Sequence, residues 1–145
     1  MIGLLQRVTE ASVAIDGKVV AAIGCGLLVL VAVTRDDTAA DVARLTERIL
    51  GYRVFPDDQG RMNLGLADLE LELLLVPQFT LAADTRKGRR ASFSRAASPE
   101  TGSALFELML KRCRERLGRV ESGVFGAHMQ VALVNDGPVT FWLES

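Results

Sequence analysis

The sequence predicts a mixed α/β domain of the α+β class over residues 1–145, with layered β-sheets and two principal helices packed on one side. Three observations lead to this fold class. Several short segments carry apolar residues in alternation or in unbroken runs, which is typical of strands. Two longer segments carry apolar residues at helical spacing behind capping residues. No linker, repeat or low-complexity segment divides the chain, and its length suits one domain.

The first part of the chain, residues 4–33, is predicted to be all strand. Residues 4–15 are extended, and Asp16-Gly17 is a strong signal for a two-residue hairpin that returns through residues 19–23. After a glycine-rich turn, residues 27–33 form an apolar run. This run predicts a strand that is buried on both faces.

The middle of the chain predicts a helix followed by a second buried strand. Asp36, Asp37 and Thr38 offer caps for a helix that ends near residue 50, where Gly51 stops it. We expect a short strand at 52–55, a turn at 56–60 and a buried strand at 69–76, which delivers residues 77–81 at its C-terminal end. Binding sites commonly lie at that end of a strand in mixed sheets.

The last third of the chain predicts a basic loop, a helix and two strands. Ser98, Pro99 and Glu100 are typical of a helix start, and Gly118 is placed to end that helix. The remaining segments are the loop at 82–97, a strand at 126–134, a turn at 135–138 and a strand at 139–143.

Composition limits the class of protein. The longest apolar run, residues 27–33, is far shorter than the ~20 residues that span a bilayer. The N-terminus lacks the pattern of a secretory signal, so we expect an unprocessed, cytoplasmic protein with no membrane partner. Cys25 and Cys113 show no disulfide or metal spacing, and we expect both to be reduced and buried.

Charge is distributed unevenly along the chain. Residues 86–119 carry ten Lys or Arg and three Glu, a net charge of +7, whereas the remainder carries seven cations and fifteen acids, a net charge of −8. Most of the cations are Arg, whose planar fork suits phosphate oxygens. A polyanion is therefore a plausible partner, and the alternative is a solvated loop and helix face. The candidate phosphate contacts are Arg86, Lys87, Arg89, Arg90 and Arg95.

Most familiar catalytic machinery is excluded. The single histidine, His128, lies in a strand-like pattern and is more typical of a structural residue than of a base. No grouped ligands for zinc, no nucleophile elbow and no nucleotide-binding glycine motif are present, so we expect neither a metal nor a cofactor. Any catalysis must therefore be chemically undemanding, or rely on main-chain groups and on the substrate.

Two separated stretches, Pro77–Leu81 and Asn135–Thr140, together resemble the paired signatures of the D-aminoacyl-tRNA deacylases, which read roughly S-Q-x-T and N-x-G-P-V-T. Pro77 departs from the pattern, because the family usually has Ser there. Judged locally, residues 135–138 are a hairpin turn between two apolar strands. The likeness extends over most of the chain, through residues 6–8, 51–55, 61–64, 92–94, 129–131 and 135–142.

The resemblance implies an enzyme that hydrolyses the ester of D-aminoacyl-tRNA, and of mischarged glycyl-tRNA, as chiral proofreading. It implies a symmetric homodimer in which a Gly-cis-Pro dipeptide, here Gly137-Pro138, enters the partner's pocket and excludes L-amino acids. It further implies that Arg7 holds the dipeptide and that Met129 lines the pocket. The Q-x-T segment, here Gln78 to Thr80, would hold the ester and the terminal adenosine.

The residues themselves favour main-chain catalysis at this segment. The N–H groups of Phe79 and Thr80 follow a strand end, have no assured partner and are suited to stabilise an oxyanion. Pro77 has neither an N–H nor a hydroxyl, so it cannot contribute. The Thr80 hydroxyl is an alternative nucleophile, but no nearby base is predicted, so we expect the substrate's ribose hydroxyl to assist.

Two other functions stay open on sequence grounds. One is a non-catalytic RNA-binding module that uses residues 86–119, although few aromatic residues are available to stack on bases. The other is an esterase of a small substrate unrelated to tRNA. The expected partners under the leading hypothesis are the aminoacylated 3′ end of tRNA and a second copy of the chain, with no DNA.

Overall fold

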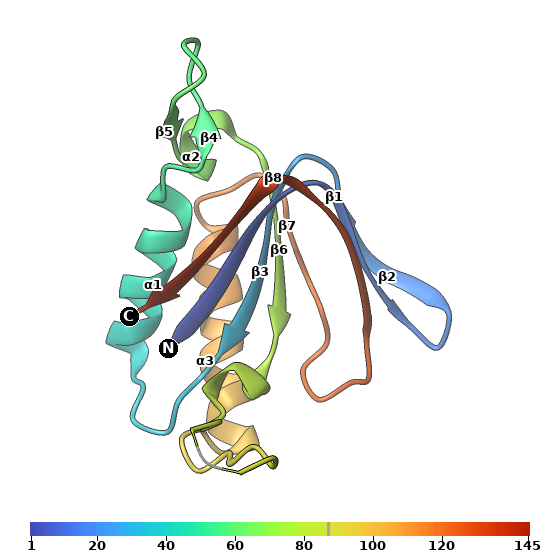
Figure 1. Ribbon diagram of the computed structural model, residues 1–145, viewed down its shortest axis with the longest axis vertical. Helices are drawn as coiled ribbons and strands as arrows, with labels where there is room; N and C mark the ends of the chain where they lie inside the picture. The colour runs from blue at the N-terminus through green and yellow to red at the C-terminus, as the bar shows by residue number, and fades with distance from the viewer. Residues whose placement is uncertain (87) are drawn as a thin grey trace.

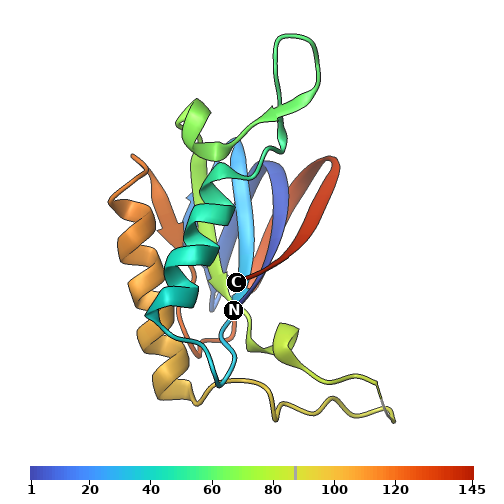
Figure 2. The same cartoon turned by 90° about the vertical axis from the view of Figure 1, so that its left-hand side faces the viewer.

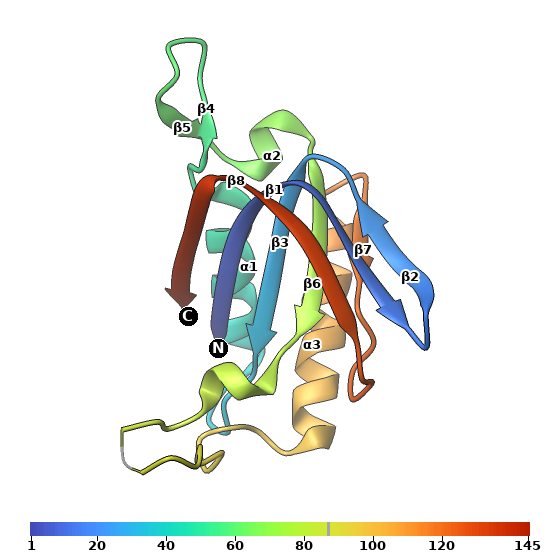
Figure 3. The same cartoon turned by 45° about the vertical axis from the view of Figure 1, so that its right-hand side comes forward.

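Two long antiparallel strands organise the computed structural model, which describes residues 1–86 and 88–145. Strand β1 (Ile2–Ile15) pairs with β8 (Gln130–Glu144) along nearly its whole length. The other edge of β1 is shared in succession by β3 (Gly26–Ala32) and β2 (Lys18–Ile23). Because β3 and β2 follow one another along the same edge, the sheet curves strongly (Figure 3).

Parallel strands extend the sheet beyond β3. Strand β6 (Glu72–Pro77) lies parallel to β3, and β7 (Val120–Ser122) lies parallel to β6. The sheet order is β2-β1-β3-β6-β7, with β8 on the remaining edge of β1. A separate antiparallel ribbon is formed by β4 (Phe55–Pro56) and β5 (Met62–Leu64) and projects from the sheet (Figure 1).

Helices α1 (Ala39–Gly51) and α3 (Pro99–Arg114) pack against each other and cover the same face of the sheet (Figure 2). Helix α1 connects the parallel strands β3 and β6, and α3 connects the parallel strands β6 and β7. Connections of this kind are almost always right-handed, and because both proceed across the sheet in the same direction, both helices lie on the same face. Two short helical turns complete the fold, α2 (Leu66–Leu69) and the 3₁₀ helix η1 (Phe79–Ala82). No helix in the described part of the chain has the length and apolar character needed to cross a membrane.

The first turn of α1 is capped from two directions. The Thr38 hydroxyl accepts a hydrogen bond from the N–H of Ala40 at 3.3 Å, and the Asp41 carboxylate accepts one from the N–H of Thr38 at 2.9 Å. The hydrogen bonds from Thr38, followed by one from the Ser145 hydroxyl, lower the pKa of Asp41 from 3.8 to about 2. Asp41 is therefore ionised at neutral pH, where its carboxylate accepts the hydrogen bond from the N–H of Thr38.

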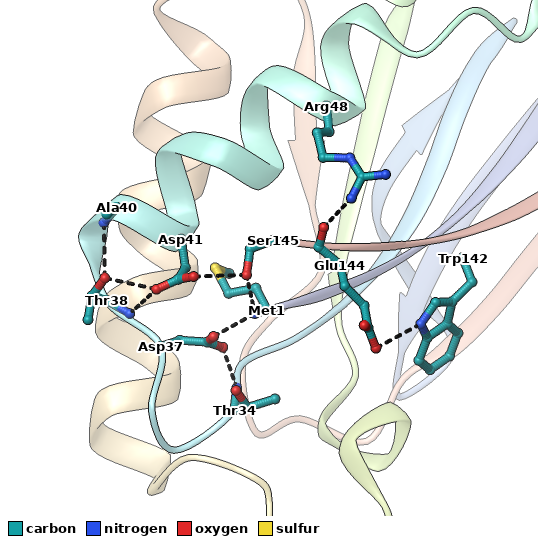
Figure 4. Close-up of polar contacts among 10 residues, drawn as sticks. All are labelled: Met1, Thr34, Asp37, Thr38, Ala40, Asp41, Arg48, Trp142, Glu144 and Ser145. Carbon is teal, nitrogen blue, oxygen red and sulfur yellow. Dashed lines mark hydrogen bonds and ion pairs between the residues drawn. The ribbon is translucent and has the colours of Figure 1, made fainter.

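A polar network joins the two ends of the chain to the β3–α1 turn (Figure 4). The α-amino group of Met1 donates to Asp37 at 2.5 Å and to the Ser145 hydroxyl at 2.8 Å, and that hydroxyl donates to Asp41 at 3.0 Å. The second carboxylate oxygen of Asp37 accepts from the N–H of Thr34 at 2.6 Å. The turn at residues 34–38 is thus held by groups from three parts of the chain.

The sheet is buried on both faces. On one face, strand residues such as Leu27 and Leu73 pack under the helices with Ile49 and Phe106, all at most 1% exposed. On the other face, Leu74 packs with residues of β1, β2 and the first half of β8. The predicted α+β class and the two principal helices on one side are confirmed. In place of separate layered sheets, the main sheet is a single curved sheet of six strands, because β1 is long enough to pair with β2, β3 and β8.

Residues 136–139 do not form the hairpin turn that their local sequence predicts. Both halves of β8 pair with β1, with Thr140 opposite Gln6 and Asn135 opposite Val8. The four residues between them therefore form a bulge opposite the single residue Arg7. The Gly137-Pro138 peptide bond within this bulge is cis.

Several predicted strand boundaries and residue environments were wrong. The strand expected from residue 69 begins at 72, after α2, and the strand expected from residue 126 begins at 130. His128 therefore precedes β8 in an exposed loop rather than lying in a strand, and Cys25 is exposed at the β2–β3 turn rather than buried. The short elements α2, β5 and β7 were not predicted.

Candidate active site

The candidate site begins where β6 runs into η1. The N–H of Gln78 donates to the carbonyl of Val31 at 2.7 Å, which completes the parallel ladder, and the N–H of Leu81 donates back to Gln78 at 3.3 Å. The two intervening N–H groups, of Phe79 and Thr80, have no hydrogen-bond partner among the described residues. They are the free donors that every helix start leaves unpaired. The segment that was expected to be a strand end is thus a helical start with two adjacent free N–H groups.

Side chains of the same segment flank these donors. The Gln78 amide nitrogen donates to the Thr80 hydroxyl at 2.5 Å, which occupies an oxygen lone pair of that hydroxyl and leaves its proton free to donate. The Phe79 ring is 56% exposed and lies 5.0 Å, centroid to centroid, from the ring of Phe93 at an angle of 59°. The two rings offer an aromatic surface beside the free N–H groups.

A pocket of about 370 Å³ opens beside η1. Its lining is mainly apolar, and Pro77, Gln78 and Phe79 form one wall. Gly102 in α3 belongs to the opposite wall, where an added Cβ would lie 3.1 Å from the Phe125 ring. Sequence reasoning did not assign these opposite-wall residues, although a glycine inside a helix is a detectable signal of close packing. The other residues that line the pocket are Val31, Val33, Phe93, Ala96, Ala97, Ser98, Pro99, Phe106, Phe125 and Gly126.

Met129, which was expected to line the pocket, is not among the residues that line it, and it packs with the apolar cluster on the face of the sheet away from the helices. Its sulfur accepts a hydrogen bond from the N–H of Val124 at 3.3 Å. An added Cβ at Gly123 would lie 2.8 Å from that sulfur and 3.4 Å from the ring of Pro77. Met129 and Pro77 thus enclose Gly123 from two sides, so the predicted residue does lie beside the end of β6.

The basic loop, residues 82–97, borders the same pocket. Its ends are joined by Asp84 and Ser92, whose main chains exchange hydrogen bonds of 2.8 and 3.1 Å. Arg86 makes two contacts of 2.9 and 2.6 Å with Asp84, and these hydrogen bonds hold the pKa of Asp84 well below its usual range. Arg89, Arg90 and Arg95 belong to this loop, and all three are exposed. Lys87 lies outside the described residues.

The cations beyond the basic loop are not part of this surface. Arg116 pairs with Glu47 at 2.5 Å and Arg119 pairs with Glu72 at 2.7 Å. Helix α3 separates them from the loop, and its 16 residues span ~24 Å at 1.5 Å per residue. The segment with net charge +7 is therefore divided between two ends of the molecule.

Arg7 and Asn135 hold the bulge that contains Gly137. The Arg7 guanidinium donates to the carbonyl of Asp136 at 3.0 Å and to the carbonyl of Val54 at 2.6 Å. The Asn135 side chain accepts from the N–H of Val139 at 2.7 Å and donates to the Thr140 hydroxyl at 2.9 Å. The Arg7 side chain is 14% exposed and joins the bulge to the segment that carries Val54.

The bulge and η1 lie at opposite ends of the sheet within one chain. Arg7, which contacts the bulge, pairs with Leu27 near the start of β3, whereas Gln78 bonds to Val31 near its end. Val31 lies four residues after Leu27, a distance of ~13 Å at 3.3 Å per residue. In Figure 1 the bend of β8 lies at the upper end of the sheet, and η1 follows the arrowhead of β6 at the lower end. One chain does not bring the two predicted halves of the site together.

Other titratable groups offer no alternative site. Across the residues that the structure describes, no three His, Cys, Asp or Glu side chains lie close enough to hold a metal ion. Burial raises the pKa of Cys113 to about 12, so its thiol stays protonated and unreactive at neutral pH.

Comparison with known proteins finds matches along the whole chain. The model of a family described as "D-Tyr-tRNA(Tyr) deacylase" matches residues 4–144. A D-aminoacyl-tRNA deacylase of Alkalilimnicola ehrlichii is 63% identical over 145 residues, which cover 100% of this chain and 97% of the relative. A D-aminoacyl-tRNA deacylase of Escherichia coli O1:K1 is 53% identical over 144 residues, which cover 99% of each chain.

Two solved structures have the same fold. The first, titled "c-Myc DNA Unwinding Element Binding Protein", is 38% identical, with a TM-score of 0.95 over 100% of this chain and 99% of the other. The second is titled a probable eukaryotic D-amino acid tRNA deacylase. It is 19% identical, with a TM-score of 0.88 over 99% of this chain and 98% of the other, and it supports the fold alone.

Proposed function

The chain belongs to the D-Tyr-tRNA(Tyr) deacylase family of ester hydrolases, and from that premise we propose how its residues remove D-amino acids, and glycine, from tRNA. The observation that carries the proposal is the pair of unbonded N–H groups of Phe79 and Thr80 beside a largely apolar pocket. The pocket takes the terminal adenosine, whose base packs on the ring of Phe79. The ester carbonyl then lies at the start of η1.

The two N–H groups stabilise the charge that develops on the carbonyl oxygen during hydrolysis. Main-chain donors are held in place by the ladder bond from Gln78 to Val31, so they need little reorganisation as the charge forms. Removal of a single oxyanion donor costs ~2.7–4 kcal/mol in a well-studied hydrolase, so two donors account for a large part of a modest acceleration.

No side chain of this segment acts as a nucleophile. The Thr80 hydroxyl already accepts a hydrogen bond from Gln78, and among the described residues no side chain accepts a hydrogen bond from that hydroxyl as a base would. The only histidine of the chain, His128, is exposed. Water therefore attacks the ester, with assistance from the hydroxyl on the adjacent ribose carbon, and Gln78 and Thr80 orient the substrate.

Selection against L-amino acids requires a second copy of the chain. The Gly137-Pro138 bulge is exposed and lies at the far end of the sheet from its own Phe79, so it reaches a pocket only in a partner. A two-fold axis places each bulge in the other subunit's pocket. There the main-chain carbonyls of the dipeptide block an L side chain, and a D side chain or the hydrogen of glycine is accepted. Arg7 keeps the bulge in position, and Met129, which packs beside Gly123 and Pro77, supports the end of β6.

The tRNA backbone lies along the basic loop. Arg89, Arg90 and Arg95 contact phosphates directly, and Arg86 exchanges its exposed pair with Asp84 for a phosphate. Lys87 is assigned to the same surface on its charge alone. Binding of this kind is electrostatic, so duplex DNA competes only as a general polyanion.

The test uses four ligands with the purified chain: D-tyrosyl-tRNA, D-tyrosyl-adenosine, D-tyrosine ethyl ester and uncharged tRNA. We expect hydrolysis of the first two, with the tRNA ester preferred, and no acceleration with the ethyl ester. Binding of uncharged tRNA without hydrolysis of any ester would identify an RNA-binding module. Equal hydrolysis of all three esters would identify a general esterase, and either result would refute the proposal.

A further inference from the structure

We propose that Arg35, on the turn between β3 and α1, binds a backbone phosphate of the unpaired 3′ end of the substrate, together with Arg95 of the basic loop. This inference rests on the proposed function, because it names a further contact for the same RNA. Arg35 lies far from residues 86–119 in the sequence, so the charge pattern did not assign it.

The turn that carries Arg35 is joined directly to the basic loop. The N–H of Arg35 donates to the carbonyl of Arg95 at 3.0 Å, and the N–H of Ala97 donates to the carbonyl of Val33 at 3.0 Å. Thr34 and Ala96 form an isolated antiparallel bridge between these two bonds. Arg35 and Arg95 are therefore neighbours across a short two-stranded contact, and both cations belong to one surface.

This surface adjoins the pocket that takes the terminal nucleotide. Val33, Ala96 and Ala97 line the pocket, and they lie next to Arg35 and Arg95 in the paired segments. An RNA strand whose last base enters the pocket leaves it over this rim. The first phosphates behind the terminal nucleoside consequently pass within reach of the two guanidinium groups.

The turn is held by hydrogen bonds that do not involve a ligand. Asp37 accepts a hydrogen bond from the N–H of Thr34 and is itself held by the α-amino group of Met1 (Figure 4). The side chain of Arg35 extends from this fixed turn and is 65% exposed. A cation on a rigid base loses less conformational freedom when it binds phosphate than one on a mobile loop.

Arg35 is available for an anion. Its guanidinium donates one long hydrogen bond of 3.5 Å to the carbonyl of Ser94, and among the described residues its ion pair is a 3.6 Å contact with Asp36, whose side chain is 90% exposed. Exposed pairs of this kind contribute little to stability. A phosphate oxygen is a stronger competitor, because the arginine fork binds it through two N–H groups. Asp36 therefore weakens RNA binding slightly rather than neutralising Arg35.

The experiment compares Arg35→Ala with wild type on D-tyrosyl-tRNA and on D-tyrosyl-adenosine, which lacks every phosphate. We expect kcat/KM for the tRNA ester to fall fivefold or more relative to kcat/KM for the adenosine ester, mainly through KM. The logarithm of tRNA affinity should also fall less steeply with the logarithm of salt concentration, by about 0.7 for one lost phosphate contact. Arg44→Ala, which removes an exposed cation from α1, is the matched control and should change neither quantity.

A second variant tests whether the negative charge of Asp36 weakens RNA binding by Arg35. Asp36→Asn removes the negative neighbour of Arg35 and should lower KM for the tRNA ester about twofold, with no such change in the Arg35→Ala background. The inference is overturned if Arg35→Ala leaves the ratio of the two substrates unchanged, or if Asp36→Asn weakens binding. Failure of wild type to hydrolyse either ester would instead refute the proposed function.

Discussion

Replacement of Phe79 by proline removes one of the two proposed oxyanion donors without the loss of a side-chain hydrogen bond. Phe79 is the first residue of η1, the position at which proline is best tolerated in a helix. The preceding residue, Gln78, has φ −144° and ψ 77°, so it lies outside the helical region that a following proline disfavours. The N–H that disappears bonds to no described residue, so the fold loses no main-chain hydrogen bond.

The matched control is Phe79→Ala, which removes the same ring but keeps the N–H. Both variants lose the contact with Phe93 and part of the pocket wall, so both should raise KM. Only the proline variant loses the donor, and one such donor is worth about 10²–10³ in kcat. We therefore expect a single-turnover rate on D-tyrosyl-tRNA that is about 100-fold lower for Phe79→Pro than for Phe79→Ala.

The measurement is the single-turnover rate at saturating enzyme, with circular dichroism and thermal melting of each variant as a check of the fold. Rates within threefold of each other in two folded variants would refute oxyanion stabilisation by this N–H. Thr80→Ala separates the remaining alternative, because it removes the hydroxyl and keeps the N–H of Thr80. A loss below tenfold is expected, whereas complete inactivation would identify Thr80 as the nucleophile.

Three further predictions concern the bulge, the stability of the fold at acid pH and the reactivity of the two thiols. Gly137→Ala places a Cβ 2.6 Å from the Val139 side chain on a residue whose φ is +145°, so the bulge must move. Deacylation assays should then show at least a tenfold lower preference for D- over L-aminoacyl-tRNA. An unchanged preference would exclude the bulge from selection. The pKa of Asp41 is about 2 in the folded chain against 3.8 unfolded, so its stabilisation is complete above pH ~4 and is lost as the pH falls towards 2. Asp41→Asn should lower the melting temperature by about 2–4 °C at pH 7 and by much less at pH 2, where about half of the Asp41 carboxyl groups are protonated in the folded chain; equal losses at both would contradict this reasoning. A thiol reagent at pH 8 should label exposed Cys25 and leave buried Cys113 unmodified until the chain unfolds; labelling of both in the folded state would contradict the burial of Cys113.

Local signals were sufficient for the elements whose ends are fixed by neighbouring residues. The caps at Thr38 and Ser98 mark the starts of α1 and α3, because a cap bonds to main-chain groups within the next three residues. The Asp16-Gly17 hairpin was predicted for the same reason, and both residues have positive φ.

Elements defined by distant partners were not predictable in the same way. Asn135 to Pro138 has the composition of a hairpin turn, but whether its flanks pair with each other or with a third strand depends on β1, more than 120 residues away. The pocket has the same difficulty. Phe79 is recognisable from its motif, whereas Phe93 and Gly102 join it only because the basic loop and α3 fold back over η1.

The site residues were located by motif rather than by periodicity. Arg7 interrupts an apolar strand, and the common explanation of such a residue is a guanidinium that reaches the solvent. In the structure it bonds to the carbonyls of Val54 and Asp136, two contacts that no local pattern encodes. The roles of Arg7, Met129 and Gly137-Pro138 in selection remain predictions for experiment.

The most direct test of the account is the ratio of deacylation rates for D-tyrosyl-tRNA and L-tyrosyl-tRNA, measured with the same purified protein and the same tRNA, with glycyl-tRNA as a third substrate. Selection by exclusion at Gly137-Pro138 predicts rapid release of D-tyrosine and of glycine, and L-tyrosyl-tRNA that decays no faster than without enzyme. Comparable release of D- and L-tyrosine would contradict the account, as would a D preference that excludes glycine, since glycine has no side chain for the dipeptide to reject.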